Sequence, residues 1–286
     1  VRGRPGPGTA GVSVVTELRL EAVDFTYPDG TRALDGVDLV VPAGSALALI
    51  GANGSGKTTL ARHLNGLLRP SSGRVVVDGI DAAERTVAQL ARLVGLCFQR
   101  PDRQIFGRTV RDEIEFGPRH QGVSSEDAFG RVKALASRLH LGEDLGAHPD
   151  DLGDTRRKLL TIASVLAMET PVVVLDEPTT GLDARGVDRI EHVVRELVEA
   201  GRTVIGISHD MRFVAETFER VVVLDGGRIA LDGTTAEVFA EDRWPALRGA
   251  GLDPPEAAVM GARLGLGSTP TEAAIVAALT SRAASR

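Results

Sequence analysis

The sequence lacks several features on which other classes of protein depend. A single cysteine, Cys97, excludes an internal disulfide framework and a cysteine-rich metal site. No stretch approaches about 18 consecutive apolar residues, so we expect no membrane-spanning segment. The six histidines are scattered, with no pair at helical spacing beside a carboxylate, and they indicate no metal site.

Basic residues are also in short supply. The formal net charge is -6 and the pI is about 5.6, without the basic surplus or basic stripe of a typical nucleic-acid binder, so we expect no nucleic-acid partner. Residues 1–16 are rich in proline and glycine and have no apolar core like that of a secretory signal. We expect this segment to be a disordered tail, and the protein to be soluble and cytoplasmic.

What the sequence does contain is an alternation of strand-like and helix-like runs. The run 46–50 is continuously apolar, as expected for a strand buried on both faces, and the runs 172–175 and 203–207 are interpreted in the same way. Helical patterns occupy 57–67 and 189–199. Further strands are predicted at 18–27, 33–41, 74–77, 221–224 and 228–231. Such an alternation predicts an α/β fold built on a largely parallel sheet.

Two segments differ from this pattern. From about 99 to 166 the chain is rich in loops and then helical, with no strong strand. From 235 to 286 it is rich in alanine and leucine, helical, and broken by Pro254 and Pro255. We therefore predict a main unit over 17–234, a helical subdomain within it at about 99–166, and a C-terminal helical extension over 235–286.

A glycine-rich loop follows the first buried strand. Residues 51–59, GANGSGKTT, match the pattern G-x-x-x-x-G-K-[ST] between a strand and a helix, the context that supports such a match. Glycines let successive backbone N–H groups face one phosphate, and the following helix adds its positive end. Lys57 is expected to bridge the β- and γ-phosphates, and Thr58 to ligate Mg²⁺. The candidate nucleotide-binding residues here are Gly51, Asn53, Gly54, Ser55, Gly56, Lys57, Thr58 and Thr59.

An acidic pair ends the second buried strand. In the run VVVLDE at 172–177 the carboxylates stand at the carboxyl edge of the sheet, where α/β proteins bind ligands. Asp176 is the candidate Mg²⁺ holder, through a water molecule, and Glu177 is the candidate general base or water-orienting group for attack on the γ-phosphate. The two motifs together predict that the protein binds ATP with Mg²⁺.

The run LDEPTTGLD at 175–183, and Ser208, His209 and Asp210 after an apolar strand, resemble the ATPase subunits of ABC transporters. The resemblance covers about residues 18–233. It implies a RecA-like P-loop core with an antiparallel β subdomain and a helical subdomain. It also implies that His209 contacts the γ-phosphate, that Gln99 senses Mg²⁺ and water and faces a membrane partner, and that Tyr27 stacks on adenine.

A narrower resemblance involves QRPDRQIF at 99–106, VRDEIEFGP at 110–118 and LRGAGLDPP at 247–255. These runs are similar to energy-coupling factor ATPases, which serve vitamin and cobalt or nickel uptake. The resemblance implies a transmembrane coupling subunit, a second ATPase subunit, and a place at the inner face of the cell membrane. Nothing in the sequence marks the cargo.

One motif departs from the family pattern. The family's signature loop, Leu-Ser-Gly-Gly-Gln, reaches across a dimer to the partner's γ-phosphate; its position holds Leu152, Gly153, Asp154, Thr155 and Arg156. This loop supplies no serine hydroxyl and brings a carboxylate toward a polyanion, where repulsion is poorly screened. We therefore expect an asymmetric heterodimer with a paralogous subunit, in which Asp183 and this loop face the partner.

Three other kinds of P-loop protein fit parts of the sequence. The altered loop is compatible with a regulatory subunit that binds nucleotide and catalyses little. A soluble ABC ATPase of translation or DNA repair is disfavoured, since the chain has one cassette and Lys57 and Asp176 are too close for a coiled-coil insert. A P-loop kinase is disfavoured by the Asp183 and His209 context.

Overall fold

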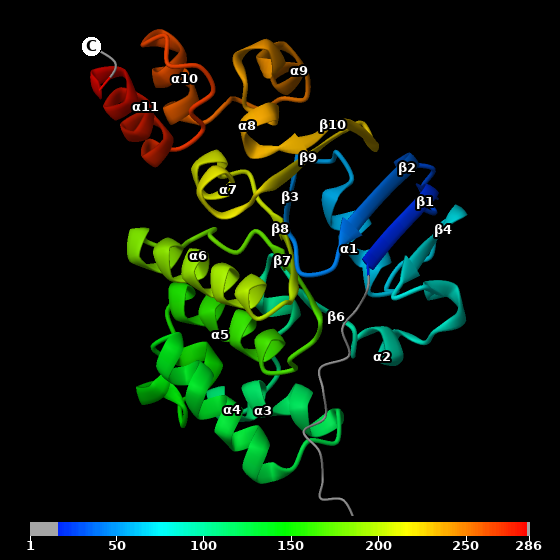
Figure 1. Cartoon of the computed structure of the whole chain (residues 1–286). Coiled ribbons are helices and arrows are strands. Elements are labelled where there is room, and N and C mark those ends of the chain that lie inside the picture. Colours follow the sequence, from blue (N-terminus) through cyan, green and yellow to red (C-terminus); the bar gives the residue numbers. More distant parts are fainter. Residues whose placement is uncertain (1–16, 285–286) are drawn as a thin grey trace, which may run out of the picture.

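The computed structural model describes residues 17–284, so the tail predicted at 1–16 lies outside the described residues (Figure 1). The described chain contains two sheets with helices around them (Figure 1). The strands, in chain order, are β1 (Glu17–Thr26), β2 (Arg32–Pro42), β3 (Ala46–Ile50), β4 (Ser72–Val77), β5 (Ile80–Asp81), β6 (Val94–Cys97), β7 (Val172–Asp176), β8 (Thr203–Ile207), β9 (Arg220–Asp225) and β10 (Arg228–Thr234).

The six-stranded sheet has the order β10-β9-β3-β8-β7-β6. Its strands run parallel from β9 to β6, and β10 joins the edge as the antiparallel arm of a hairpin. Every residue of β3, β7 and β8 is buried, which explains why these strands are almost entirely apolar in sequence, apart from Asp176 at the end of β7 and Thr203 at the start of β8. The parallel arrangement places the carboxyl ends of β3 and β7 at the same edge.

The four-stranded sheet is antiparallel, in the order β2-β1-β4-β5. Along β1 buried and exposed residues alternate in part, because one face packs inward and the other faces water. The inward face shares a core with α1 (Lys57–Leu64) and with one face of the larger sheet. The phosphate loop between β3 and α1 is thus fixed between two sheets.

Helices cover the opposite face of the six-stranded sheet, and a second core lies beneath them. Figure 1 shows α3 to α6 stacked on one side of the molecule and α8 to α11 gathered beyond β10. The remaining helices are α2 (Val87–Leu90), α3 (Val110–His120), α4 (Ser125–Arg138), α5 (Asp154–Leu166), α6 (Ala184–Glu199), α7 (Met211–Thr217), α8 (Thr235–Val238), α9 (Trp244–Gly249), α10 (Glu256–Arg263) and α11 (Glu272–Ala284).

The predicted fold class is confirmed: a P-loop α/β core carries an antiparallel β subdomain, a helical subdomain and C-terminal helices. Some details of the elements differ from the predictions. The helix predicted over 57–67 ends at Leu64, because Gly66 takes a positive φ of 75° that does not continue a helix. The short strand β6 was absent from the predicted strands.

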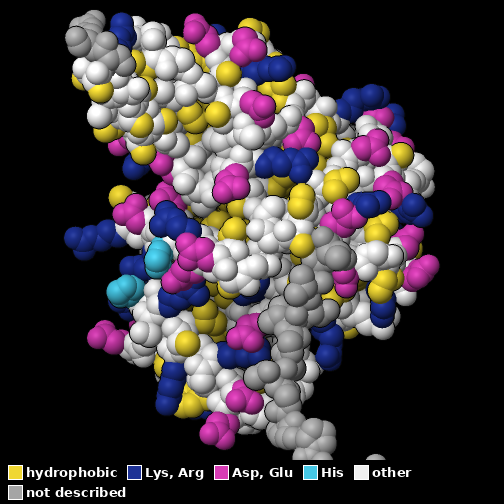
Figure 2. Space-filling view, in the orientation of Figure 1, with side chains coloured by type: hydrophobic (Ala, Val, Ile, Leu, Met, Phe, Trp, Pro, Cys, Tyr) yellow, Lys and Arg dark blue, Asp and Glu magenta, His cyan; other side chains and the backbone are white. Residues whose placement is uncertain are grey.

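The visible surface is mixed in charge. In the space-filling view, acidic and basic side chains are interspersed over the described part of this face, and hydrophobic side chains gather over the C-terminal helices (Figure 2). Exposed apolar residues of α10 and α11 include Met260 and Val276. Among the described residues no helix has both the length and the apolar character needed to cross a bilayer.

Candidate functional site

The phosphate loop, residues 51–56, depends on its glycines. Gly54 and Gly56 have φ angles of 83° and 109°, which favour glycine because other residues are strained there. A Cβ at Gly56 would also lie 2.5 Å from the carbonyl oxygen of Ala33 on β2. The loop therefore packs against neighbouring backbone, and its conformation leaves no room for a side chain at this point.

Lys57 lies folded over this loop. Its Nζ donates hydrogen bonds to the carbonyl oxygens of Gly51 and Ala52, both at 2.8 Å, and the side chain is buried. Burial lowers the pKa of Lys57, while the carboxylates of Glu177 and Asp176 act in the opposite direction. The ammonium is thus partnered by neutral carbonyls beside a cavity, where a phosphate would be a stronger partner.

Thr58 and Asp176 meet at the carboxyl edge of the parallel sheet. The Thr58 Oγ1 donates to the Asp176 Oδ2 at 3.0 Å, although 118 residues separate them in the sequence. Asp176 is 2% exposed, and burial raises the pKa of its carboxyl group. One hydroxyl and one carboxylate beside a phosphate-binding loop suit Mg²⁺, which completes its shell with water and phosphate oxygens.

No denser metal-binding cluster competes with this pair. Across residues 17–284, no group of three or more His, Cys, Asp or Glu side chains is placed to hold an ion. Gln99, which follows β6, lines the same cavity as Thr58 and Asp176. The structure therefore brings together the three residues predicted as Mg²⁺ ligands.

Glu177 and His209 form a pair at the ends of β7 and β8. The His209 Nδ1 lies 2.7 Å from the Glu177 Oε2, and because a carboxylate only accepts, Nδ1 carries the proton of this bond. Glu177 adopts a φ of 51°, an uncommon backbone conformation for a residue other than glycine. The Glu177 N–H donates a hydrogen bond to the carbonyl of Ile207 at 2.8 Å, and this bond to the end of β8 stabilises the uncommon backbone conformation.

Tyr27 stands at the end of the antiparallel sheet, beside the start of α1. Its hydroxyl and the Thr59 Oγ1 are 2.9 Å apart, and its ring meets the Phe25 ring edge-on at 4.9 Å between centroids. These contacts hold the ring at the rim of the cavity from two sides. A fixed aromatic face there is suited to stacking on a base.

A single cavity of about 350 Å³ gathers most of the predicted residues. Gly51 and Ser55 complete the loop beneath it, and His209 joins it through Glu177. Its lining comes from both sheets, from α1 and from the loop after β6: Tyr27, Thr31, Ala33, Asn53, Gly54, Gly56, Lys57, Thr58, Thr59, Gln99, Asp176, Glu177 and Ile207. The cavity can hold a phosphate chain at one end and an aromatic base at the other.

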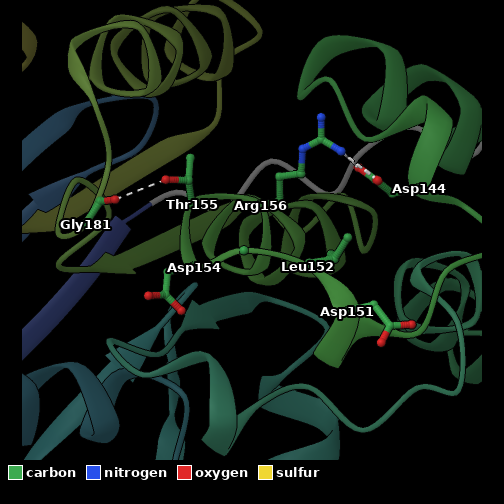
Figure 3. A pocket seen from close by; sticks show the side chains of 8 residues that line it. Asp144, Asp151, Leu152, Asp154, Thr155, Arg156 and Gly181 are labelled. Atoms are coloured by element: carbon green, nitrogen blue, oxygen red, sulfur yellow. Dashed lines mark hydrogen bonds and ion pairs between the residues drawn. The ribbon is translucent and has the colours of Figure 1, made fainter.

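The residues at the signature position do not line this cavity. Residues 151–156 line a separate hollow of about 570 Å³ together with Asp144 and Gly181 (Figure 3). Thr155 Oγ1 donates to the Gly181 carbonyl at 3.2 Å, and Arg156 binds both oxygens of Asp144 at 2.7 and 2.8 Å (Figure 3). Asp183 lies apart from both cavities and caps α6 by accepting from the Gly186 N–H.

Some residues near the site were absent from the predictions. Thr31, Ala33 and Ile207 line the cavity but carry no motif. Lys158 on α5 is 3% exposed, and its Nζ lies 3.0 Å from the Gln99 carbonyl oxygen. A signal for Lys158 was available: it is a lysine at the start of the apolar run LLTIASVLA, on the buried face of a helix.

Comparisons with known proteins agree with this geometry. The family model described as ABC transporter matches residues 34–180. The energy-coupling factor transporter ATP-binding protein EcfA of Methanothermobacter thermautotrophicus is 38% identical over 226 residues, which cover 78% of this chain and 73% of that protein. The structure of cbiO1 from Clostridium perfringens, part of the ABC transporter complex cbiONQ, has a TM-score of 0.72 and 33% identity, covering 88% of this chain and 100% of that one.

Other relatives are longer. A putative ABC transporter ATP-binding protein of Caldanaerobacter subterraneus is 40% identical over 248 residues, which cover 87% of this chain but 43% of that protein. The chain spans about two fifths of the length of this and the next two curated relatives that it matches.

Proposed function

Because the chain belongs to the ABC transporter family of ATP-binding proteins, we propose that it binds MgATP and hydrolyses it to drive a membrane importer of the energy-coupling factor type. One observation carries the proposal: Lys57, Glu177 and the Thr58–Asp176 pair line one cavity, and His209 contacts Glu177 from outside its lining. Relatives named as energy-coupling factor ATP-binding proteins support the choice of transporter class.

Each side chain has a proposed task in hydrolysis. The N–H groups of the phosphate loop and the start of α1 hold the phosphates, and Lys57 moves from the loop carbonyls to the β- and γ-phosphates. Thr58, Asp176 and Gln99 would hold Mg²⁺, which would supply positive charge against the phosphate oxygens. Positioning and electrostatics are the protein's main contributions, because phosphoryl transfer requires little covalent chemistry from it.

Glu177 and His209 are proposed to act on the attacking water. Glu177 accepts a proton from the water as its oxygen bonds to the γ-phosphorus, and the bond from the γ-phosphorus to the bridging oxygen breaks to leave ADP and inorganic phosphate. The His209 contact of 2.7 Å fixes the carboxylate, and His209 is the proposed contact to the γ-phosphate. The strained backbone at Glu177 supports a functional role for this residue.

A transmembrane coupling subunit is the proposed partner, which would place the chain at the cytoplasmic face of the membrane. The surface that supports docking is formed by the loop after β6 and by α3, where Phe106 and Phe116 are 62% and 41% exposed and their rings meet edge-on. The buried Glu113 holds this loop by accepting from the N–H groups of Phe106 and Gly107 at 3.0 and 2.7 Å. Movement of Gln99 would reach the membrane partner through this loop.

We also propose that the second ATPase subunit is a paralogue and that the two nucleotide sites are unequal. The donors at the signature position are engaged within this chain, Thr155 with Gly181 and Arg156 with Asp144. The Asp154 carboxylate opens α5 without a hydrogen-bonding cap from Gly153. In one site, the γ-phosphate of the nucleotide bound by the partner would face the Asp154 carboxylate and be repelled by it. In the other site, the nucleotide bound in this chain's cavity needs only an intact signature loop from the partner.

The experiment compares ATP turnover by the purified chain alone with turnover by an equimolar mixture with its paralogue. We expect the mixture to be active and the chain alone to be nearly inactive. A matched variant restores the family's loop by Gly153→Ser, Asp154→Gly, Thr155→Gly and Arg156→Gln; it should raise turnover of the chain alone. Robust turnover by the unaltered chain alone would refute the asymmetry.

A second function, a regulatory subunit that binds nucleotide without hydrolysing it, is favoured by the altered signature position alone. The intact Glu177–His209 pair favours the ATPase. ATP binding without turnover, both alone and in the paralogue mixture, would select the regulatory role. Co-purification with detergent-solubilised membrane proteins, rather than with ribosomes, would support the transport assignment over a soluble ABC ATPase.

A further inference from the structure

A buried ammonium group lies outside the roles described above. Lys158 is in α5, is 3% exposed, and has its Nζ 3.0 Å from the Gln99 carbonyl oxygen, 3.3 Å from that of Asp176 and 3.5 Å from that of Phe98. The contacts lie at the carboxyl ends of β6 and β7. One side chain of α5 thus contacts the backbone at the ends of two strands.

Stability alone does not explain this lysine. Burial lowers the pKa of Lys158, and no ion pair to a carboxylate within 4.0 Å is found for it among the described residues. Burying an ammonium against carbonyl oxygens is unfavourable relative to an apolar side chain, and the nearby carboxylates of Asp176 and Glu177, which raise the pKa of Lys158, offset only part of the effect of burial. The next two buried positions of α5, Leu159 and Leu160, carry apolar side chains.

The carbonyls that Lys158 contacts belong to important neighbours. Gln99 and Asp176 both line the nucleotide cavity and are two of the three proposed Mg²⁺ ligands. Because one ammonium lies near both carbonyls, it restrains the separation of their side chains in the cavity. Outer contacts of this kind orient the residues that hold a metal ion.

A second set of hydrogen bonds joins the segment after β6 to α5. Gln104 donates from Nε2 to the Thr161 carbonyl at 2.9 Å and to the Ser164 Oγ at 3.1 Å, and its Oε1 accepts from the Phe98 N–H at 3.0 Å. The segment after β6 is therefore attached to α5 at two points. Since α5 begins at the signature position, Lys158 stands where that helix, the Gln99 segment and the end of β7 meet.

We propose that Lys158 is a positioning residue, which holds the backbone of Gln99 and Asp176 in register with α5 and so sets the geometry for Mg²⁺ and for hydrolysis. The inference rests on the proposed ATPase function. It assigns Lys158 an effect on Mg²⁺ dependence and on turnover, and little effect on the Mg²⁺-free affinity for nucleotide, because Lys158 lines no part of the cavity.

The test compares Lys158→Met with Lys133→Met, which removes an exposed ammonium from α4. A fluorescent ATP analogue is titrated with and without Mg²⁺, and turnover is measured in the complex with the paralogue. For Lys158→Met we expect Mg²⁺-free affinity within about twofold of the unaltered protein, and a loss of about tenfold or more in Mg²⁺ affinity and in kcat. Lys133→Met should match the unaltered protein.

A change in melting temperature alone, with Mg²⁺ dependence and kcat unaltered, would overturn the proposal. If Lys158→Met does not fold, Lys158→Gln, which keeps a polar donor of shorter reach, is judged by the same criteria. Absence of hydrolysis in the unaltered complex would reject the ATPase function instead, and the Mg²⁺ titration would still decide the role of Lys158.

Discussion

Replacing Glu177 by glutamine tests the central step of the proposed mechanism. The change keeps the size and hydrogen-bonding shape of the side chain but removes its ability to accept a proton from water. The amide can still contact His209 and Thr180, which lie 2.7 and 3.3 Å from the carboxylate oxygen. Because Lys57 and the phosphate loop are untouched, ATP binding should persist.

The expected magnitude follows from the role of a general base. Such a group contributes roughly 10²–10⁴-fold to the rate, equivalent to about 2.7–5.4 kcal/mol of activation free energy. Burial of Glu177, which is 7% exposed, limits replacement of the carboxylate by bulk water, so we place the loss in kcat in this range. The dissociation constant for ATP should change by no more than about twofold, since interactions with the ground state are retained.

The assay measures phosphate release at saturating ATP in the paralogue mixture, together with a nucleotide titration. Glu199→Gln, an exposed position at the end of α6, is the matched control and should behave like the unaltered protein. Lys57→Ala should instead lose nucleotide binding, which separates the two roles. Turnover of Glu177→Gln within about threefold of the control would contradict the assignment of Glu177 as the base.

Substitutions at three other residues test the rest of the site. Tyr27→Ala should weaken ATP binding by about 1–3 kcal/mol, while Tyr27→Phe, which keeps the ring and loses the Thr59 contact, should weaken it less; equilibrium titration distinguishes them. Gly56→Ala should lower the melting temperature and abolish ATP binding, because the added Cβ would lie 2.5 Å from the Ala33 carbonyl at a φ of 109°; normal ATP binding by the variant would contradict this. Burial raises the pKa of Asp176, so the stabilising contribution of its protonated form is present below pH 3.8 and is lost as the pH rises through the raised pKa of the folded state. At pH 7, Asp176→Asn should therefore raise the melting temperature of the nucleotide-free protein and remove the Mg²⁺ dependence of nucleotide binding. An unchanged melting temperature would reject the argument that the buried charge is destabilising.

Short-range patterns in the sequence were enough to predict the phosphate loop. The residues of 51–59 are neighbours in the chain, and the local backbone preferences of glycine determine the curve of the loop. The buried strands could also be predicted, because strands covered on both faces are apolar throughout. The strand β6 is buried in the same way but was harder to predict, since a run of four residues is a weaker signal than the longer buried strands.

The acidic pair at 176–177 and His209 were predicted from motif and from family resemblance rather than from geometry. Their contacts depend on the order of strands in the sheet, which places β8 between β3 and β7. Only that order brings Thr58 within 3.0 Å of Asp176, and His209 within 2.7 Å of Glu177. Strand order is a non-local property, since it is selected by the packing of both sheet faces.

By itself, therefore, the sequence determined the chemistry that the chain has available: a phosphate loop, an acidic strand end and an altered signature position. Tertiary structure alone decided which side chains meet. It placed Lys158 beside the carbonyls of Gln99 and Asp176, and it engaged Arg156 with Asp144. The physical reason is that a local pattern can indicate that a charge is buried but not what it contacts, because its partners come from strands and turns that only folding brings together.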